Sequence, residues 1–194
     1  MMLTQNITLL SPEDTLLLVI DVQEKLLPAV FSAEKLLWNT KRLIEGAKIF
    51  GLPILVTEQY PQGLGQTVQE IKSLLPEKVT FFEKKSFSAC LIPNFVEKII
   101  QNENIRNILI CGMETHVCVL QTALDLLAAG LQVHLAADAV SSRFETDYDI
   151  SLRRMETSGA FVTTTEASLF ELCRTAESPY FKSVSKIVRE KFVS

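Results

Sequence analysis

The chain has 194 residues, of which 47% are hydrophobic and 22% are charged, and its formal net charge is −4. These values predict one soluble globular domain over residues 1–194, and the acidic balance gives no basic surface for nucleic acid. The apolar runs are too short to span a membrane, and the N-terminal stretch MMLTQNITLLSPED lacks the pattern of a secretory signal. We therefore expect a cytoplasmic protein that binds neither nucleic acid nor membranes.

Short apolar runs alternate along the chain with longer segments of helical period. The runs predict strands at Leu16–Val22, Pro53–Glu58, Val79–Glu83, Asn107–Cys111, Gln132–Ala137 and Ala160–Thr165. Between them we expect helices near 33–50, 92–103, 115–129 and 146–158, with one or two more from 167 onward, including an amphipathic one in SPYFKSVSKIVREKF.

Several of these strands are apolar on both faces, which is typical of parallel strands covered by helices on both sides. The alternation of strand and helix predicts an α/β fold with three layers, a doubly wound and mainly parallel sheet of Rossmann-like type. The connection 59–77 is the least regular, and we expect it to overhang the functional site.

Ligands of such sheets bind beyond the carboxyl ends of the strands, so reactive side chains there are the first candidates. Asp21 closes the first strand, Lys84 follows the third, and Cys118 lies just after the fourth. Each has an ordinary alternative: a helix-capping aspartate, a solvated surface lysine or a small buried thiol. Lys85 is a second lysine that position alone does not exclude.

Cys118 is the most informative of the four cysteines, which contain no CxxC pair and are expected to be reduced. It falls in the first turn of the helix 115–129, for which Thr115 is the expected N-cap, and the positive end of a helix favours a thiolate. His116 should point to another face and His134 lies within a strand, so neither is expected to activate the thiol. Asp21 then becomes the expected proton acceptor.

Other kinds of site are poorly represented in the sequence. The stretch DVQEKLLP after the first strand has no glycine for a phosphate loop, and the two histidines have no metal-ligand spacing. We therefore expect no cofactor and no metal.

The chain resembles the isochorismatase-like cysteine hydrolases, and is most similar to the uncharacterised isochorismatase domain-containing proteins. The resemblance rests on LLLVIDVQEKL, PILVTEQYPQGLG, FEKKSFSA and GMETHVCVLQTALDLLAAGLQVHLAADAVSSR. It implies a six-stranded parallel sheet, a triad of Cys118, Asp21 and Lys84, and a homo-oligomer. The register of Phe87-Ser88-Ala89 selects Lys84 over Lys85.

The resemblance also implies a cis peptide between Met113 and Glu114. This bond would aim the N–H of Glu114, beside that of Cys118, at an oxyanion.

Metal-dependent nicotinamidases of this superfamily carry an Asp-x-His motif where this chain reads TEQYPQGLG, and isochorismatases proper do not use the cysteine as nucleophile. We therefore expect a hydrolase that acts on a small-molecule amide or related C–N bond. Gln23, Tyr60 and Phe87 are the expected pocket wall. The alternatives are a vinyl-ether hydrolase, a non-catalytic interaction or scaffold protein, a thiol redox protein and a flavodoxin-like nucleotide carrier.

Overall fold

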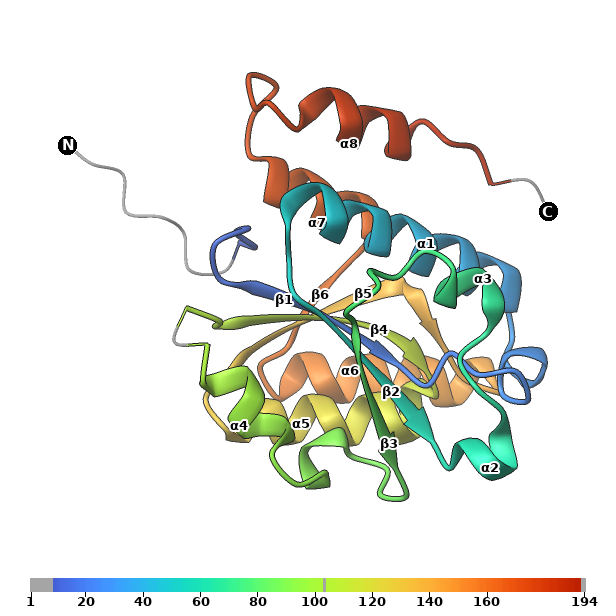
Figure 1. Cartoon of the computed structure of the whole chain (residues 1–194). Helices are drawn as coiled ribbons and strands as arrows, with labels where there is room; N and C mark the ends of the chain where they lie inside the picture. Colours follow the sequence, from blue (N-terminus) through green and yellow to red (C-terminus); the bar gives the residue numbers. More distant parts are fainter. Residues whose placement is uncertain (1–8, 103, 193–194) are drawn as a thin grey trace.

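The computed structural model describes residues 9–102 and 104–192, and it contains a six-stranded sheet with the order β3-β2-β1-β4-β5-β6 (Figure 1). Every neighbouring pair of strands is parallel. The strands are β1 (Thr15–Ile20), β2 (Ile54–Gln59), β3 (Thr80–Lys84), β4 (Asn107–Met113), β5 (Gln132–Ser141) and β6 (Phe161–Thr163). The chain moves outward from β1 to β3 and then returns to β4 on the other side of β1. This confirms the predicted doubly wound sheet.

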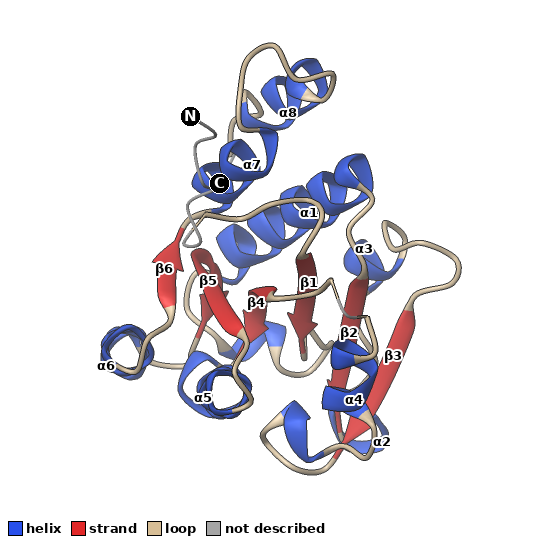
Figure 2. Cartoon of the chain, turned by 90° about the vertical axis from the view of Figure 1, so that its left-hand side faces the viewer, coloured by secondary structure: helices blue, strands red, loops and turns tan. Residues whose placement is uncertain are grey.

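Helices cover both faces of the sheet, as Figures 1 and 2 show. One layer holds α1 (Ala33–Phe50), α7 (Thr165–Cys173) and α8 (Phe181–Val188), and the other holds α4 (Phe95–Ile100), α5 (Leu120–Ala128) and α6 (Glu145–Thr157). Shorter pieces are the 3₁₀ turns η1 (Leu27–Ala29) and η2 (Ala89–Leu91), the helices α2 (Pro61–Leu64) and α3 (Gln69–Lys72), and the π-helical turn η3 (Thr115–Val119).

Strand β1 lies at the centre and is buried on both faces. Leu17 and Val19 belong to the hydrophobic core under α1, whereas Leu16, Leu18 and Ile20 belong to the core under α4, α5 and α6. Successive side chains of a strand point to opposite faces, so one apolar run supplies both cores. This burial fixes the register of β1 and hence the position of the residue that follows it.

Strand β5 is irregular near its carboxyl end. Its pairing with β4 shifts between Ile110 and Gly112, so that Leu135 faces Ile110 while Val140 faces Gly112. The extra residues of β5 form a bulge opposite β4, and pairing with β6 stops at Ala136. The strand continues to Ser141, four residues beyond the predicted end.

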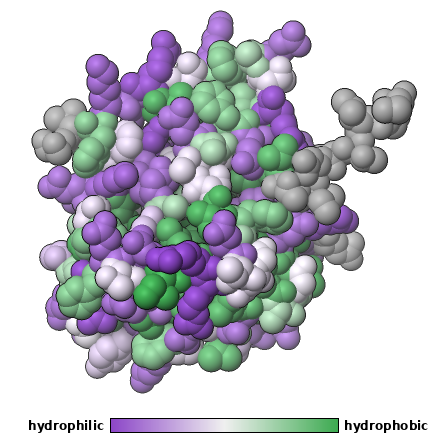
Figure 3. All heavy atoms as spheres, turned by 180° about the vertical axis from the view of Figure 1, so that it is seen from behind, coloured by the Kyte–Doolittle hydropathy of each residue, from purple (hydrophilic) through white to green (hydrophobic). Residues whose placement is uncertain are grey.

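The remaining elements lie close to their predicted positions. Helix α1 has the predicted bounds, and the connection 59–77 contains the short helices α2 and α3. Residues 1–8, where we expect no signal peptide, lie outside the described residues, as does residue 103 at the end of the expected helix 92–103. Among the described helices, none is both long and apolar enough to cross a membrane. The face in Figure 3 mixes hydrophilic with hydrophobic side chains.

Candidate active site

Asp21 follows β1 directly and points into the interior at the carboxyl edge of the sheet. Its backbone has a φ of +54°, a conformation that Asp adopts more readily than most residues, and the residue is completely buried. The Thr57 hydroxyl, from the adjacent strand β2, donates to Asp21 Oδ1 at 2.7 Å. A buried carboxylate needs such partners, because its desolvation is costly.

Lys84 is the last residue of β3 and its side chain is also buried. Its Nζ donates to Asp21 Oδ2 at 2.7 Å and to Gln59 Oε1 at 2.7 Å. Lys85, the alternative lysine, is exposed. The structure therefore places Lys84, and not Lys85, against Asp21.

Cys118 lies in η3, which continues directly into α5, and is 5% exposed. Its Sγ lies 3.3 Å from Lys84 Nζ and 4.0 Å from Gln59 Oε1. Three side chains from the ends of β1, β3 and β4 are thus brought into contact around one ammonium group. They meet at the point where the strand order reverses.

The ionisation of Cys118 is set mainly by its burial. Burial, together with the charge of Asp21, raises the pKa of the Cys118 thiol to about 12, and Lys84 only partly opposes this. The helix terminus does not overcome the loss of water around the sulfur. At neutral pH the group is a thiol, so nucleophilic attack requires a proton acceptor, the role for which the sequence suggested Asp21.

Neither histidine contacts Cys118, in agreement with the sequence. His134 Nε2 lies 3.1 Å from Asn107 Oδ1, and burial lowers the pKa of His134 to about 4. His116 Nδ1 lies 3.0 Å from Ser142 Oγ instead. Among the ionisable groups, Lys84 contacts the sulfur, and Asp21, which Lys84 also binds, raises the pKa of the thiol.

The turn between β4 and Cys118 is held by its own contacts. The Met113–Glu114 peptide is cis, as the resemblance implies, and the Glu114 carbonyl accepts from the N–H groups of Val117 and Val119. The Glu114 carboxylate lies 3.1 Å from Arg143 Nε. Glu114 is the residue that precedes the helix, so the expected capping role of Thr115 is wrong.

Gln59 is a site residue that the sequence reasoning missed. Besides its contact with Lys84, its Nε2 donates to the Lys85 carbonyl at 2.9 Å. Its amide therefore holds the Lys84 ammonium together with Asp21. Its position, one residue after the predicted end of the strand 53–58, could have identified Gln59 as a candidate site residue.

Gln23 differs from its expected place in the pocket wall. It is completely buried, and its amide binds the Gln59 backbone N–H at 2.7 Å, the Gln59 carbonyl at 3.0 Å and the Gly65 carbonyl at 2.6 Å. Because both the oxygen and the nitrogen of its side-chain amide bind backbone groups, Gln23 holds the backbone of Gln59 and is not available to a ligand.

Tyr60 and Phe87, the other expected wall residues, are 48% and 52% exposed. Tyr60 lines a pocket of about 320 Å³ beside the site, together with Pro61, Gln62, Glu83, Lys84 and Lys85. Both aromatic rings are therefore accessible, and Tyr60 shares this pocket with Lys84.

In the part of the chain that the structure describes, no group of three or more His, Cys, Asp or Glu is arranged to hold a metal ion.

Comparison with known proteins gives consistent matches. The isochorismatase domain family matches residues 15–167. The chain is 39% identical to mouse isochorismatase domain-containing protein 2A, over 92% of this chain and 84% of that protein.

Solved structures of similar proteins share this fold. MAR1 ribonuclease from Caenorhabditis elegans is 39% identical, with a TM-score of 0.89 over 95% of this chain and 94% of that one. YcaC from Pseudomonas aeruginosa, solved with hexane-2,5-diol and covalent acrylamide, is 26% identical, with a TM-score of 0.87 over 95% and 92%. The YcaC product of Escherichia coli, described as an octameric hydrolase of unknown specificity, is also 26% identical, with a TM-score of 0.86 over 95% and 91%. The fold, the matched domain and these relatives together show that this chain belongs to the isochorismatase family.

Proposed function

We propose that this chain hydrolyses the C–N bond of a small amide through a thioester formed on Cys118. The observation that carries the proposal is the buried contact of Lys84 Nζ with both Asp21 Oδ2 and Cys118 Sγ. A thiol, a carboxylate and an ammonium in contact supply a nucleophile, a proton acceptor and a group that stabilises negative charge.

In the first step Asp21 accepts the proton of the Cys118 thiol while the sulfur attacks the carbonyl carbon. The raised pKa of Cys118 makes this transfer necessary, because the resting sulfur is protonated. A new S–C bond forms, and the electron pair of the carbonyl π bond moves to its oxygen. Lys84 stabilises the negative charge that develops within the buried cluster.

The oxygen anion needs donors at its new position, and the N–H groups of Glu114 and Cys118 are our candidates. The Glu114 carbonyl is bound by two amides of η3, which limits rotation of this turn. Losing one such donor typically costs about 3 kcal/mol of transition-state stabilisation.

Collapse of the intermediate breaks the C–N bond, and the protonated Asp21 gives its proton to the leaving amine. Water then attacks the thioester, Asp21 accepts a proton from it, and the departing Cys118 sulfur takes that proton back. The net reaction consumes one water and releases an acid and an amine, with the enzyme restored.

Two structural relatives are consistent with this chemistry. The P. aeruginosa YcaC structure holds covalent acrylamide, a small amide that alkylates thiols, and the E. coli protein is described as a hydrolase. The C. elegans protein is described as a ribonuclease, whereas the net charge of −4 here does not favour RNA binding.

We also propose that the protein is a homo-oligomer in solution. The E. coli relative is octameric. Phe87, Leu91 and Phe144 are 52%, 69% and 67% exposed, and such apolar side chains are often covered in an assembly. Light scattering after size exclusion tests this, and a monomer at all concentrations would refute it.

The decisive experiment is ammonia release from a panel of small primary amides by wild type, Cys118→Ala, Asp21→Asn and the matched control Cys90→Ala. We expect release by wild type and Cys90→Ala, and a decrease of about 10³-fold or more in the other two. Mass spectrometry should detect an acyl-enzyme on wild type and Cys90→Ala, and none on Cys118→Ala.

Equal release by wild type and Cys118→Ala would refute the role of Cys118. Cleavage of a short RNA by wild type but not by Cys118→Ala, with no amide turned over, would replace the amidase proposal by a nuclease one.

A further inference from the structure

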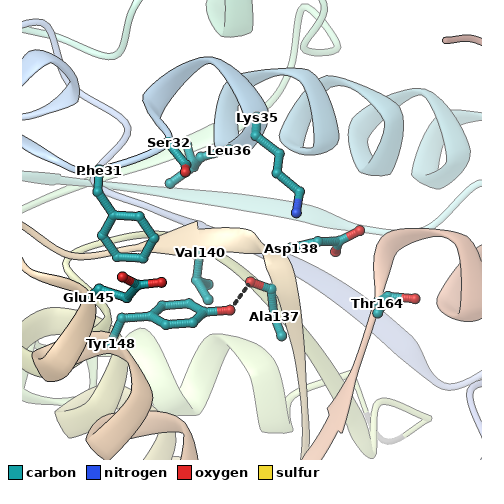
Figure 4. Close-up of a pocket in the computed structure, with 10 residues that line it drawn as sticks. All are labelled: Phe31, Ser32, Lys35, Leu36, Ala137, Asp138, Val140, Glu145, Tyr148 and Thr164. Carbon is teal, nitrogen blue, oxygen red and sulfur yellow. Dashed lines mark hydrogen bonds between the residues drawn. The ribbon is translucent and has the colours of Figure 1, made fainter. Parts of the chain in front are cut away.

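A second pocket lies at the carboxyl ends of β5 and β6, outside the Cys118 cluster. Its volume is about 360 Å³, within the range of small-molecule sites. It is lined by Phe31, Ser32, Lys35, Leu36, Ala137, Asp138, Val140, Glu145, Tyr148 and Thr164 (Figure 4). None of these residues has a role in the reaction proposed above.

The bulge of β5 creates this pocket. Pairing with β6 ends at Ala136, and pairing with β4 resumes only at Val140. Side chains take over part of the missing ladder: the Tyr148 hydroxyl donates to the Ala137 carbonyl at 2.7 Å, and Asn39 Nδ2 donates to the Asp138 carbonyl at 2.7 Å. The backbone is thus fixed in a shape that leaves space beside it.

The aromatic wall is also fixed. The rings of Phe31 and Tyr148 meet edge to face, with centroids 5.3 Å apart. Burial, with the charges of Asp138 and Asp149, raises the pKa of Tyr148, so its hydroxyl stays protonated and bound to Ala137. A ligand therefore meets a preformed apolar surface and not a collapsed one.

The charges of the lining are unequal, with carboxylates on Asp138 and Glu145 and one ammonium on Lys35. Among the described residues, none of these three groups has an ion-pair partner within 4.0 Å. Asp138 Oδ1 accepts from the Thr165 N–H at 2.7 Å and its hydroxyl at 2.9 Å, whereas Oδ2 has no hydrogen bond to the part of the chain described. In Figure 4, Lys35 extends from α1 toward Asp138, and Glu145 and Tyr148 extend from α6.

Two helix N-termini face this region, and such termini ordinarily attract anions. Here each already has a carboxylate of the protein: Asp138 binds the first N–H of α7, and Glu145 lies in the first turn of α6. Neither terminus is therefore open to an anionic ligand.

We propose that this pocket binds a small organic cation, a primary amine with a flat apolar body. The ammonium would bind Asp138 Oδ2, and the body would lie against Phe31 and Tyr148 beside Glu145, where a cation also gains from the aromatic faces. Lys35 would compete with the ligand for Asp138.

Benzylamine is a suitable probe, with benzyl alcohol and benzoate as its neutral and anionic counterparts. Binding is measured by titrating the ¹⁵N-labelled full-length protein and following its amide resonances. We expect benzylamine to bind with a Kd on the order of 1 mM, as is usual for so small a ligand, and to shift amides of the pocket lining. Benzyl alcohol should bind about tenfold more weakly or worse, and benzoate should not bind.

Asp138→Asn removes the charge and keeps an oxygen that can accept from Thr165. Glu145→Gln removes the charge of an exposed side chain. Each should weaken benzylamine about tenfold, whereas Glu156→Gln, an exposed carboxylate on the same helix, should not. Lys35→Met should tighten binding. Three results would each overturn the proposal. They are benzoate binding as tightly as benzylamine, no saturable shift of the amide resonances with benzylamine, and an unchanged affinity of Glu145→Gln for benzylamine.

Discussion

Replacing Lys84 by Met tests the buried ion pair without any knowledge of the substrate. Lys84 Nζ lies 2.7 Å from Asp21 Oδ2, and both side chains are fully buried. With an effective dielectric constant of about 20, the attraction at this distance is about 6 kcal/mol, part of which offsets desolvation. Removing one partner of such a pair costs about 3–5 kcal/mol, because the other charge stays buried and unpaired.

We therefore expect Lys84→Met to lower the free energy of unfolding by about 3–5 kcal/mol and the Tm by about 6–20 °C. Urea and thermal unfolding measure both values. The double variant Asp21→Asn/Lys84→Met should be more stable than Lys84→Met by about 2 kcal/mol, because neither charge remains. Lys85→Met, at the neighbouring exposed lysine, should change stability by less than about 0.5 kcal/mol. A Lys84→Met variant as stable as wild type would refute the reasoning.

The other predictions concern reactivity, acid stability and packing. Alkylation of Cys118 by iodoacetamide should keep accelerating from pH 7 to pH 10, because its pKa is raised to about 12; a plateau near pH 9 would contradict this burial effect. The lowered pKa of His134 stabilises the fold above the unfolded value of 6.5, and this contribution should be lost as the pH falls toward about 4. The loss is on the order of 3 kcal/mol, and replacing His134 by Gln should flatten this part of the stability curve measured in urea. A Cβ on Gly112 would lie 2.0 Å from the Ile20 carbonyl oxygen, so Gly112→Ala should cost more than about 3 kcal/mol. Gly130→Ala has open space and should cost about 1 kcal/mol from its φ of +85° alone; equal thermal losses in the two variants would refute the steric argument.

The chain's hydrophobic pattern was sufficient for much of the fold. The apolar run of β1 predicts burial on both faces, and the 3.6-residue period of 33–50 predicts α1 with the observed bounds. Because parallel strands end at one edge of the sheet, the same pattern placed Asp21, Lys84 and Cys118 together. The choice of Lys84 over Lys85 needed the family resemblance, since neighbouring lysines have the same local preference.

Tertiary structure alone decided the environment of these groups. Gln59 binds Lys84 only because β2 and β3 are neighbours, and Gln23 is buried because the chain folds back over it near Gly65. The thiol pKa of Cys118 depends on burial and on the charge of Asp21, which is 97 residues away in the sequence (118 − 21). Local sequence sets conformational preference over a few residues, whereas desolvation and charge depend on groups that only the completed fold brings together.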